Sequence, residues 1–485
     1  MTRFPVGSIA SPHERGWSAL RRRYAGRRVL VLGGGRSGVA AALLLARAGA
    51  RVALSDVRER PEFAELERAK VSVRIGPQGP EVLEGAEVVV KSPGLPPEHP
   101  AVRAARERGI PVVSEVGLSL PLLPHPRVAV TGSNGKTTVV LWTRHILALA
   151  GWEAVAAGNV GVPLSGVAGE LSPRARLVAE LSSFQLEDMR LANEAFRAEV
   201  AVLTNLYPHH VDYHGSLAAY AQAKAHLFAA QGPGDVAVVR DAPETLALLE
   251  GHRGRRLLVG LRRPDAPWAA FVREDGEPRL ALAFGAAVFP LLPVRALPLP
   301  GRHNAENALF AAAAAHLLGA SVDALVEGLR TFSGVPHRLE YVGEFSGVHV
   351  YNDSKATNPE AAATALAALS GRPTVLLAGG LERGESLSPL APYFAGREGD
   401  LRALIAYGEM GPRLAQAARE AGLGSVHLVL TLAEAVGRAR ELVRPGDVLL
   451  LSPAAASWDQ YPDFEARGEE FRRLVREAFA APSGP

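Results

Sequence analysis

The sequence predicts an α/β protein of three domains, each built on a mostly parallel sheet. Short apolar runs of strand length alternate with helical patterns along almost the whole chain, which is typical of strand–helix–strand units. Two of these runs, at 28–32 and 127–131, lead directly into glycine-rich turns and then into helical patterns. A chain of 485 residues has room for about two to four domains.

Composition and charge limit the classes of function. The chain is 48% hydrophobic and 21% charged, and its 53 basic and 50 acidic side chains give a net charge of only +3. This balance argues against a broad nucleic-acid surface. There is no cysteine, which excludes disulfides, thiolate metal sites and cysteine nucleophiles. Because neither a signal peptide nor a membrane-length apolar run is present, we expect a cytoplasmic protein without membrane insertion.

The first predicted domain comprises residues 1–115. It begins with an arginine-rich arm, which we expect to be mobile and solvated. Its sheet and first long helix are predicted at 28–32, 36–50, 51–56, 86–91 and 110–115. Gly33, Gly35 and Gly38 form G-x-G-x-x-G between a strand and a helix, and Asp56 ends the next strand. This spacing fits a dinucleotide or any nucleotide diphosphate, whose phosphates the backbone N–H groups could approach, and equally an ordinary tight turn.

The second predicted domain comprises residues 116–334 and contains the stretch T-G-S-N-G-K-T-T at 131–138. Its ending matches the common phosphate loop G-x-x-x-x-G-K-[ST], but Val130 stands where that pattern needs its first glycine. The strand–turn–helix setting still favours phosphate binding over a plain turn. Lys136 would supply positive charge, and Thr137 or Thr138 a hydroxyl suited to Mg²⁺.

Further polar residues of this domain follow apolar runs. Glu180 ends the run at 175–180, where an acid beside a phosphate loop is expected to coordinate Mg²⁺, although such acids are more often structural. His210 ends the next run, with His209 and His214 nearby. Clustered histidines suggest zinc, but the preceding phosphate loop favours a magnesium–nucleotide setting. Lys224 lies in a predicted helix and by default is solvated.

The third predicted domain comprises residues 335–485 and repeats the α/β rhythm. Strands are predicted at 347–354, 373–380, 401–408, 425–431 and 447–455, and helices at 358–369, 411–422, 432–443 and 463–480. The polar group Asp353, Ser354, Lys355 and Thr357 follows the first of these strands. It suits recognition of a carboxylate together with a phosphate, or it is a polar turn before a helix capped by Asn358.

Several stretches, taken together, resemble the Mur ligase family. They are TGSNGKTT, GRHNAENALFAAAA and PHRLEYV…VYNDSKATNPEA, in the family's order. The first group would also suit other amide-forming ligases, such as folylpolyglutamate synthases. ELSSFQLE at 180–187 and LLSPAAASWDQYPDFEARGEEF at 450–471 resemble the members that add D-glutamate.

This resemblance implies a UDP-binding Rossmann-like domain, a central P-loop ATPase domain and a Rossmann-like C-terminal domain. The implied reaction joins D-glutamate to UDP-N-acetylmuramoyl-L-alanine with ATP, through an acyl phosphate, in peptidoglycan synthesis. The implied cofactors are two Mg²⁺ ions, and the expected state is a monomer. Another Mur-type amino-acid ligase is the alternative. A dinucleotide-dependent oxidoreductase built on the first glycine turn would leave the second glycine turn and the third domain unexplained.

The resemblance also assigns site residues. For ATP they are Gly132, Ser133, Asn134, Gly135, Lys136, Thr137, Thr138, Asn304, Asn307, Arg338 and Asp353; for the metals they are Thr137, Glu180, His210 and Lys224. For the UDP-linked substrate they are Ser37, Asp56, Arg58, Gly94, Asn159 and Ser182; for D-glutamate they are Thr357, Arg383, Ser457 and Phe464. The implied catalytic set is Lys136, His210, Lys224 and Lys355, with Lys224 carrying a carbamate.

Three positions depart from the family pattern. His209 stands where an acid is expected, and Trp458 replaces a smaller apolar residue. Arg383 replaces a lysine that grips glutamate, and arginine can hold a carboxylate as a two-pronged fork. These departures affect the detail of the amino-acid pocket more than the reaction.

Overall fold

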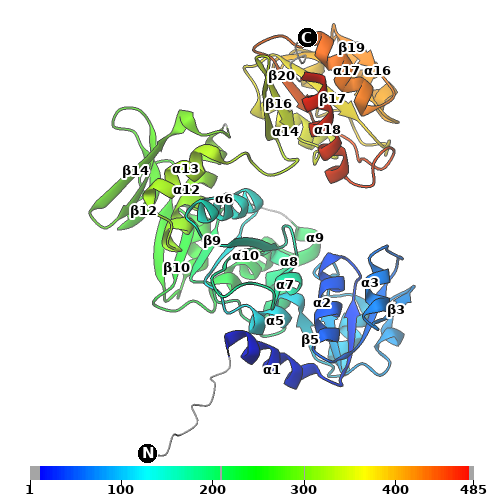
Figure 1. The fold of residues 1–485 in the computed structure, drawn as a ribbon, viewed down its shortest axis with the longest axis vertical. Helices are drawn as coiled ribbons and strands as arrows, with labels where there is room; N and C mark the ends of the chain where they lie inside the picture. Colours follow the sequence, from blue (N-terminus) through cyan, green and yellow to red (C-terminus); the bar gives the residue numbers. More distant parts are fainter. Residues whose placement is uncertain (1–10, 208–209, 300, 480–485) are drawn as a thin grey trace, which may run out of the picture. The chain divides into compact units, whose positions relative to one another are not determined.

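The computed structural model describes residues 11–207, 210–299 and 301–479, and it divides into two compact units. The first unit contains a five-stranded and a nine-stranded sheet, and the second, which comprises residues 298–301 and 331–485, contains a six-stranded sheet (Figure 1). Most strand pairs in all three sheets are parallel, which confirms the predicted α/β fold. The domain boundaries after residues 115 and 334 stay predictions.

The N-terminal arm is partly helical, so the prediction of a mobile, solvated arm was wrong for its second half. Helix α1 spans Pro12–Tyr24 and buries Leu20 and Tyr24. Ser11 and Glu14 form a capping box: the Ser11 hydroxyl accepts from the Glu14 N–H at 3.2 Å, and the Glu14 carboxylate accepts from the Ser11 N–H at 2.6 Å. The S-P-H-E pattern, with proline in the first turn, carried this signal. Residues 1–10 lie outside the described part of the chain.

The first sheet has the strand order β3-β2-β1-β4-β5 and is parallel throughout. Its strands are β1 Arg28–Leu32, β2 Arg51–Asp56, β3 Ser72–Ile75, β4 Val88–Lys91 and β5 Val112–Ser114, with helices α2 Arg36–Arg47, α3 Phe63–Arg68, α4 Pro100–Glu107 and α5 Glu115–Ser119. The connection after β1 runs to β2, whereas the connection after β4 runs to β5, in the opposite direction along the sheet. The loops after β1 and β4 therefore flank a switch point, where open α/β sheets bind ligands.

The nine-stranded sheet has the order β14-β13-β12-β11-β10-β9-β6-β8-β7, with antiparallel pairing at β12–β13 and β13–β14. Its strands are β6 Arg127–Thr131, β7 Ala154–Gly158, β8 Arg176–Glu180, β9 Val200–Leu203, β10 Val236–Arg240, β11 Arg255–Val259, β12 Trp268–Arg273, β13 Arg279–Phe284 and β14 Ala287–Pro293. Its helices are α6 Lys136–Leu149, α7 Leu164–Val167, α8 Ser183–Leu191, α9 Val211–His214, α10 Leu217–Ala225, α11 Pro243–Leu246, α12 Arg302–Leu317 and α13 Val322–Thr331.

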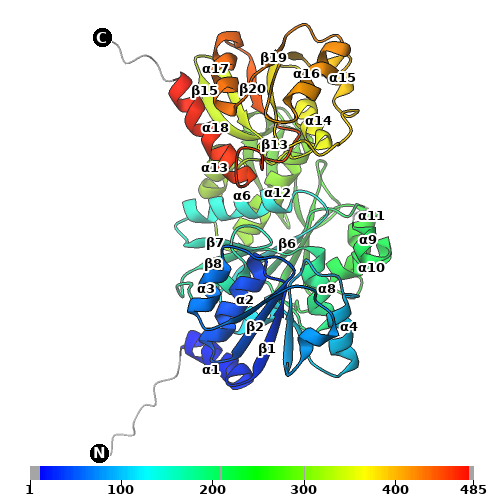
Figure 2. The same cartoon turned by 90° about the vertical axis from the view of Figure 1, so that its right-hand side faces the viewer.

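The third sheet has the order β15-β16-β20-β17-β18-β19, in which only β15 is antiparallel. Its strands are β15 Glu340–Phe345, β16 Val348–Asn352, β17 Thr374–Gly379, β18 Leu401–Tyr407, β19 Val426–Leu428 and β20 Val448–Leu451, with helices α14 Pro359–Ala368, α15 Ala391–Phe394, α16 Gly411–Glu420, α17 Leu432–Leu442 and α18 Phe464–Phe479. Alternate strand residues pack against α14–α16 on one face and against α17 and α18 on the other (Figure 2). This two-sided burial explains why these strands read as continuous apolar runs.

None of the helices in the described part of the chain has both the length and the apolar character needed to cross a bilayer.

The glycine turn after β1 offers a matched test of packing. A Cβ added at Gly38 would lie 1.8 Å from the Gly33 carbonyl oxygen, whereas a Cβ at Gly35 would meet nothing within 4 Å. We expect Gly38→Ala to lower the free energy of unfolding by about 1–3 kcal/mol, since a close-packed turn must open, and Gly35→Ala to change it by less than about 0.5 kcal/mol. Calorimetric unfolding of both variants would measure this, and equal stabilities would contradict it.

Candidate active site

The turn after β6 forms a tight loop that only glycine permits at two positions. Gly132 has φ of 145° and Gly135 has φ of 82°, a region that disfavours residues with a Cβ. A Cβ at Gly132 would lie 2.0 Å from the Thr204 hydroxyl oxygen, and one at Gly135 would lie 2.4 Å from Asn307 Oδ1. Glycine is thus required at position 132 because the backbone there lies against Thr204, which follows β9. This glycine stands two positions after the first glycine of the common phosphate loop.

Residues following β9 anchor the loop. Thr204 Oγ1 donates to the Asn134 carbonyl at 2.6 Å, and the Asn134 N–H donates to Asn205 Oδ1 at 2.9 Å. Ser133 Oγ lies 2.9 Å from the Tyr220 hydroxyl and accepts from the Tyr207 N–H at 2.8 Å. Sequence reasoning missed these anchors, because they lie about 70 residues from the loop they hold.

Lys136 begins helix α6 and folds back over the loop. Its Nζ donates to the Gly132 and Ser133 carbonyls, both at 2.9 Å. The first turn of α6 presents the N–H groups of Lys136, Thr137 and Thr138 at the positive end of the helix dipole. A cation and a helix N-terminus at the end of a parallel strand form an environment suited to phosphate groups.

Glu180, at the end of β8, is buried beside the first turn of α6. The Thr137 hydroxyl donates to its Oε2 at 2.8 Å, and the Asn159 side-chain amide donates to its Oε1 at 2.7 Å. The structure thus brings together two predicted metal residues and one predicted substrate residue. Hydroxyl and carboxylate oxygens are ligands that Mg²⁺ accepts.

Lys224 is buried, contrary to the default expectation of a solvated lysine. Its side chain is only 1% exposed, its Nζ donates to the Gly132 carbonyl at 2.8 Å, and it lies 4.6 Å from the centre of the Tyr220 ring. Burial lowers the pKa of Lys224 well below its usual range; the Lys136 cation lowers it further, while Glu180 opposes the shift. The geometry therefore favours a neutral amine at this position.

His210 is exposed and has a left-handed backbone, with φ of 53°. Its ring centre lies 4.9 Å from that of Phe184 and 6.3 Å from that of Tyr220. Tyr220 thus contacts both predicted second-metal residues, His210 and Lys224. Histidine 209 lies outside the described residues, and the described part of the chain holds no cluster of three or more acids or histidines with metal-binding geometry.

Helix α12 places the two predicted adenine-side residues close to the loop. Asn307 is buried, and its Nδ2 donates to Asn304 Oδ1 at 3.3 Å. Asn307 Oδ1 is the atom that a Cβ at Gly135 would strike. The alanine-rich helix therefore brings these amides to the phosphate loop.

The loops of the first sheet bring together only part of the predicted UDP set. Asp56 is buried, and its carboxylate accepts from the Gly34 N–H at 2.6 Å and from the Arg58 N–H at 2.9 Å. It thus holds the glycine turn in shape, as a structural acid would. Ser37 lies in the first turn of α2, Arg58 and Gly94 are exposed, and Ser182 caps α8 with a capping box.

In the second unit, most of the predicted residues follow three neighbouring strands, β16, β17 and β20, whereas Arg338 lies in the turn before β15. Asp353 accepts from the Leu339 N–H at 2.9 Å and from the Ser452 hydroxyl at 2.8 Å, and burial raises its pKa to about 6. Lys355 Nζ lies 5.5 Å from the Phe464 ring centre. Arg338 is exposed, Thr357 is half-buried and Ser457 is buried.

Two residues of the predicted amino-acid pocket that depart from the family pattern, Arg383 and Trp458, contact each other. The Arg383 guanidinium lies 4.6 Å from the centre of the Trp458 indole, whose side chain is 61% exposed. A guanidinium over an indole face is an attractive arrangement that also restricts the arginine. Arg383 and Trp458, two of the residues that depart from the family pattern, are thus in direct contact.

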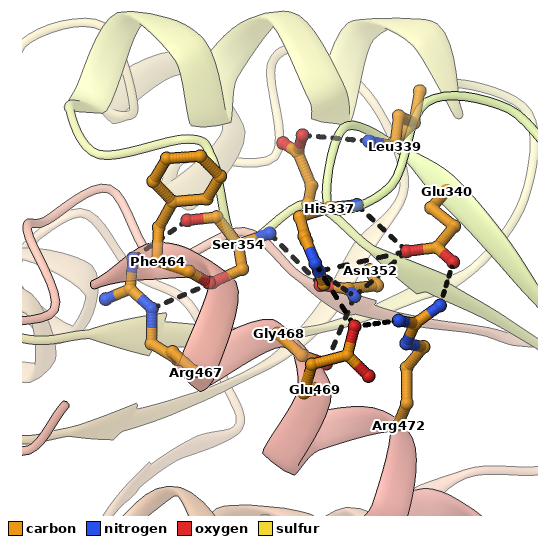
Figure 3. Close-up of polar contacts among 11 residues, drawn as sticks. His337, Leu339, Glu340, Asn352, Ser354, Phe464, Arg467, Gly468, Glu469 and Arg472 are labelled. Atoms are coloured by element: carbon orange, nitrogen blue, oxygen red, sulfur yellow. Dashed lines mark hydrogen bonds and ion pairs between the residues drawn. The ribbon is translucent and has the colours of Figure 1, made fainter. Parts of the chain in front are cut away.

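A buried arginine missed in the sequence links the segments at the ends of β16, β17 and β20. Arg467, in α18, is fully buried and donates to the Ser354 hydroxyl at 3.0 Å and carbonyl at 2.8 Å (Figure 3). It also donates to the Ala455 carbonyl at 3.0 Å and to the Gly379 carbonyl at 3.4 Å. The sequence did contain a signal for the burial of Arg467, because this residue lies on the same apolar face of α18 as Phe471 and Val475.

A second set of contacts joins α18 to the turn before β15. Asn352 Nδ2 lies 3.0 Å from His337 Nδ1 and donates to the Gly468 carbonyl at 3.2 Å. Glu340 accepts from the His337 N–H at 2.9 Å and from Arg472 at 2.7 Å (Figure 3). These contacts fix the turn that carries Arg338, where His337 and Leu339 have positive φ.

Comparison with known proteins identifies the family. Residues 27–114, 130–315 and 337–455 match, in order, the family descriptions "Mur ligase MurD-like, N-terminal domain", "Mur ligase middle domain" and "Mur ligase, glutamate ligase domain". The chain is 42% identical over 459 residues to the UDP-N-acetylmuramoylalanine–D-glutamate ligase of Geobacillus kaustophilus, covering 94% of this chain and 98% of the relative. The chain belongs to the Mur ligase family.

Further relatives agree with this membership. The enzyme of the same name from Rubrobacter xylanophilus is 45% identical over 454 residues, covering 93% of this chain and 98% of the relative. Solved structures of MurF from Acinetobacter baumannii and of the UDP-N-acetylmuramate–alanine ligase MurC from Thermotoga maritima align with TM-scores of 0.55 and 0.54, at 19% and 18% identity. They cover 92% and 93% of this chain, and 93% and 99% of their own. At such identities they support the Mur ligase fold alone.

The buried arginine can be tested against an exposed arginine of the same helix. Arg467→Met would leave several buried carbonyls without their donor, so we expect it to lower the free energy of unfolding by about 2–4 kcal/mol. Arg473, which pairs with Glu470 and Glu477 at the surface, is the control, and Arg473→Met should change stability little. Urea unfolding followed by circular dichroism measures both, and similar losses would contradict a specific role for Arg467.

Proposed function

We propose that this chain is an ATP-dependent ligase that joins D-glutamate to UDP-N-acetylmuramoyl-L-alanine in peptidoglycan synthesis. One observation carries the proposal: relatives named for this reaction are 42–45% identical over more than nine-tenths of the chain. The arrangement at the ends of β6 and β8 supports it, because this reaction needs a phosphate loop beside a buried acid. The monomeric state expected from the sequence stays a prediction.

The ATP site is proposed from the loop and its surroundings. Backbone N–H groups of Gly132–Thr138 would hold the phosphates, and Lys136 would neutralise them. Asn304 and Asn307 would contact the adenine side. Arg338, Asp353 and Lys355 would bind the γ-phosphate and ribose. Asp353 is already oriented by two hydrogen bonds, so little order is lost when it accepts a ligand.

The residues present fit Mg²⁺ at the first metal position. Glu180 is a buried carboxyl group whose described hydrogen-bond donors, Thr137 and Asn159, are both neutral, and carboxylate and hydroxyl oxygens are ligands that suit Mg²⁺. Bound Mg²⁺ would neutralise phosphate and carboxylate charge and polarise the transferred group. Thr137 and Glu180 would hold the first ion, and His210 and Lys224 the second.

Lys224 fits the second metal position only after modification, because an ammonium group repels a metal. A neutral amine reacts with CO₂ to form a carbamate, releasing one proton and leaving an anionic oxygen ligand. Burial of Lys224 and its lowered pKa favour the neutral amine that this step needs. We therefore propose that Lys224 is carbamylated in the active enzyme.

The proposed chemistry proceeds in two steps. A carboxylate oxygen of the UDP-linked substrate attacks the γ-phosphorus of ATP, the bond to ADP breaks, and an acyl phosphate forms. The amine of D-glutamate then attacks the acyl carbon, phosphate leaves, and the amide remains after the nitrogen loses its proton. Lys136 and Lys355 would stabilise the charge that develops on the phosphoryl group. His210, which is exposed and lies near the Phe184 ring, would be available to accept the proton.

The two remaining sites bind the substrates. Ser37, Asp56, Arg58 and Gly94 would contact uridine and diphosphate, with Asn159 and Ser182 nearer the muramoyl end. Thr357, Arg383, Ser457 and Phe464 would bind D-glutamate. Arg383, held over Trp458, would clasp a carboxylate in two-pronged fashion.

Amino-acid specificity tests the proposed function directly. Phosphate release from ATP should require both UDP-N-acetylmuramoyl-L-alanine and D-glutamate. Release driven by L-alanine, L-lysine or diaminopimelate in place of D-glutamate would favour another Mur-type ligase. Turnover with a nicotinamide cofactor and without ATP would favour an oxidoreductase.

Lys136 offers a test of the division between sites. Lys136→Ala should reduce turnover by at least about a hundredfold, because charge on the transferred group loses its cation. Binding of the UDP-linked substrate, measured by calorimetry, should survive, since its proposed contacts lie elsewhere. Lys70→Ala, at an exposed lysine of the first sheet's domain, is the control. Loss of substrate binding in Lys136→Ala would refute the assignment.

Lys224 offers a test of the carbamate. Lys224→Ala should lose turnover, and added acetate or formate should restore part of it by supplying the missing carboxylate oxygen. Lys224→Met, which fills the same space with an apolar chain, should not be rescued. Equal responses of the two variants, or no CO₂-derived mass on Lys224 in the wild type, would count against the modification.

A further inference from the structure

A buried ion pair joins the first sheet's domain to the central domain. Lys91, the last residue of β4, lies 2.7 Å from Asp188 Oδ1 and donates to Asp188 Oδ2 at 2.8 Å. The two side chains are 1% and 3% exposed. Asp188 belongs to α8, the helix that follows Glu180 and is capped by Ser182. The pair is thus placed between two segments to which substrate contacts are assigned.

Tyr213 extends this pair toward the histidine segment. Its hydroxyl lies 3.5 Å from Lys91 Nζ and donates to the Leu95 carbonyl at 3.3 Å. Its ring centre lies 4.0 Å from that of Phe184, which also contacts His210. Lys91 Nζ also donates to the Ser92 carbonyl at 3.3 Å. One connected set of contacts therefore runs from the loop 92–95 to the segment 210–214.

Stability does not account for a pair of this kind. Burial raises the pKa of Asp188 to about 7 and lowers the pKa of Lys91, so the surroundings disfavour both charges. Well-packed apolar residues in place of a buried ion pair are often as stable or more stable, whereas a specific pair can fix the register of two elements. Registration of the two domains is therefore the function that the geometry suggests.

Lysine usage supports a particular role for Lys91. The chain contains lysine at only five positions, 70, 91, 136, 224 and 355, while its other basic side chains are arginines. Three of the remaining four are assigned to the chemistry above. A compact ammonium group with three donors can contact Asp188, Tyr213 and the Ser92 carbonyl at once, which a planar guanidinium would do less well.

We propose that Lys91, Asp188 and Tyr213 are positioning residues that fix the distance between the loop 92–95 and the segment 210–214. This inference rests on the proposed function, in which Gly94 of the loop contacts the UDP end of the substrate and His210 of the segment serves the second metal ion and proton transfer at the reacting end. A substrate anchored at one end reacts efficiently only if the reacting group is delivered in register. Misplacement by about 1 Å can cost on the order of a hundredfold in rate.

The test compares two substrates. The full substrate is UDP-N-acetylmuramoyl-L-alanine, and the truncated one is N-acetylmuramoyl-L-alanine 1-phosphate, which lacks the uridine monophosphate. The ratio of their kcat/KM values measures what the UDP end contributes to the reaction at the other end. A wild-type enzyme that turns over neither with D-glutamate would refute the proposed function, and this result is separate from any effect on the ratio.

Two variants disrupt the contacts among Lys91, Asp188 and Tyr213 in different ways. Lys91→Met with Asp188→Leu removes both charges together, so neither is left buried alone. Tyr213→Phe removes only the hydroxyl and keeps the ring against Phe184. We expect each to lower the ratio, by at least about tenfold in the double variant, with activity on the truncated substrate within about twofold of wild type. Tyr213→Phe keeps the test valid if the double variant does not fold.

A second ion pair between the same domains provides the control. Arg47, in α2, lies 2.6 Å from Glu170, and both side chains are 55% exposed. Arg47→Met with Glu170→Leu should leave the ratio unchanged. The proposal would be overturned if the Lys91/Asp188 and Tyr213 variants lost activity equally on the two substrates, or if neither variant changed the ratio. The same fall in the ratio in the Arg47/Glu170 control would also overturn it.

Discussion

The place of β6 between β8 and β9 is the constraint on which the rest of the active-site geometry depends. Parallel strands end at a common edge, and here the register pairs Val130 with Glu180 and Thr131 with Leu203. Glu180 therefore meets Thr137 at the start of α6, while Thr204 meets the Asn134 carbonyl. A slip of one residue in β8 would turn the Glu180 carboxylate to the other face of the sheet. Glu180 would then lose its contacts with Thr137 and Asn159.

The sequence predicted what local patterns determine. Strand–turn–helix order located the glycine turns, Glu180 and the strand ends of the third sheet. It could not show which residue holds which, because Thr204, Lys224 and Arg467 act on partners about 70 to 110 residues away. The local sequence predicts that Lys224 is a solvated helix residue, whereas in the fold it is buried against the Gly132 carbonyl. By contrast, the error over α1 was avoidable, since its capping box is a local signal.

Lys91, Arg467 and Lys224 are buried basic side chains, and each has a different kind of partner. Lys91 is matched by a carboxylate, Arg467 by carbonyl and hydroxyl oxygens, and Lys224 by a carbonyl and an aromatic face. Desolvation is costly in every case, but only a lysine can relieve it by losing its proton. Arg467 holds loops of the third sheet together through its hydrogen bonds, whereas Lys224 is open to chemistry at its amine.

The burial of lysine amines also makes the chain unusually selective toward acylating reagents. Of its five lysines, Lys70 and Lys355 are exposed, Lys136 is half-buried, and Lys91 and Lys224 are shielded from solvent. An amine-directed label or crosslinker would therefore attach mainly at two positions of the described chain, Lys70 in the first unit and Lys355, beside the Phe464 ring, in the second. Amine chemistry thus addresses one exposed lysine in each unit.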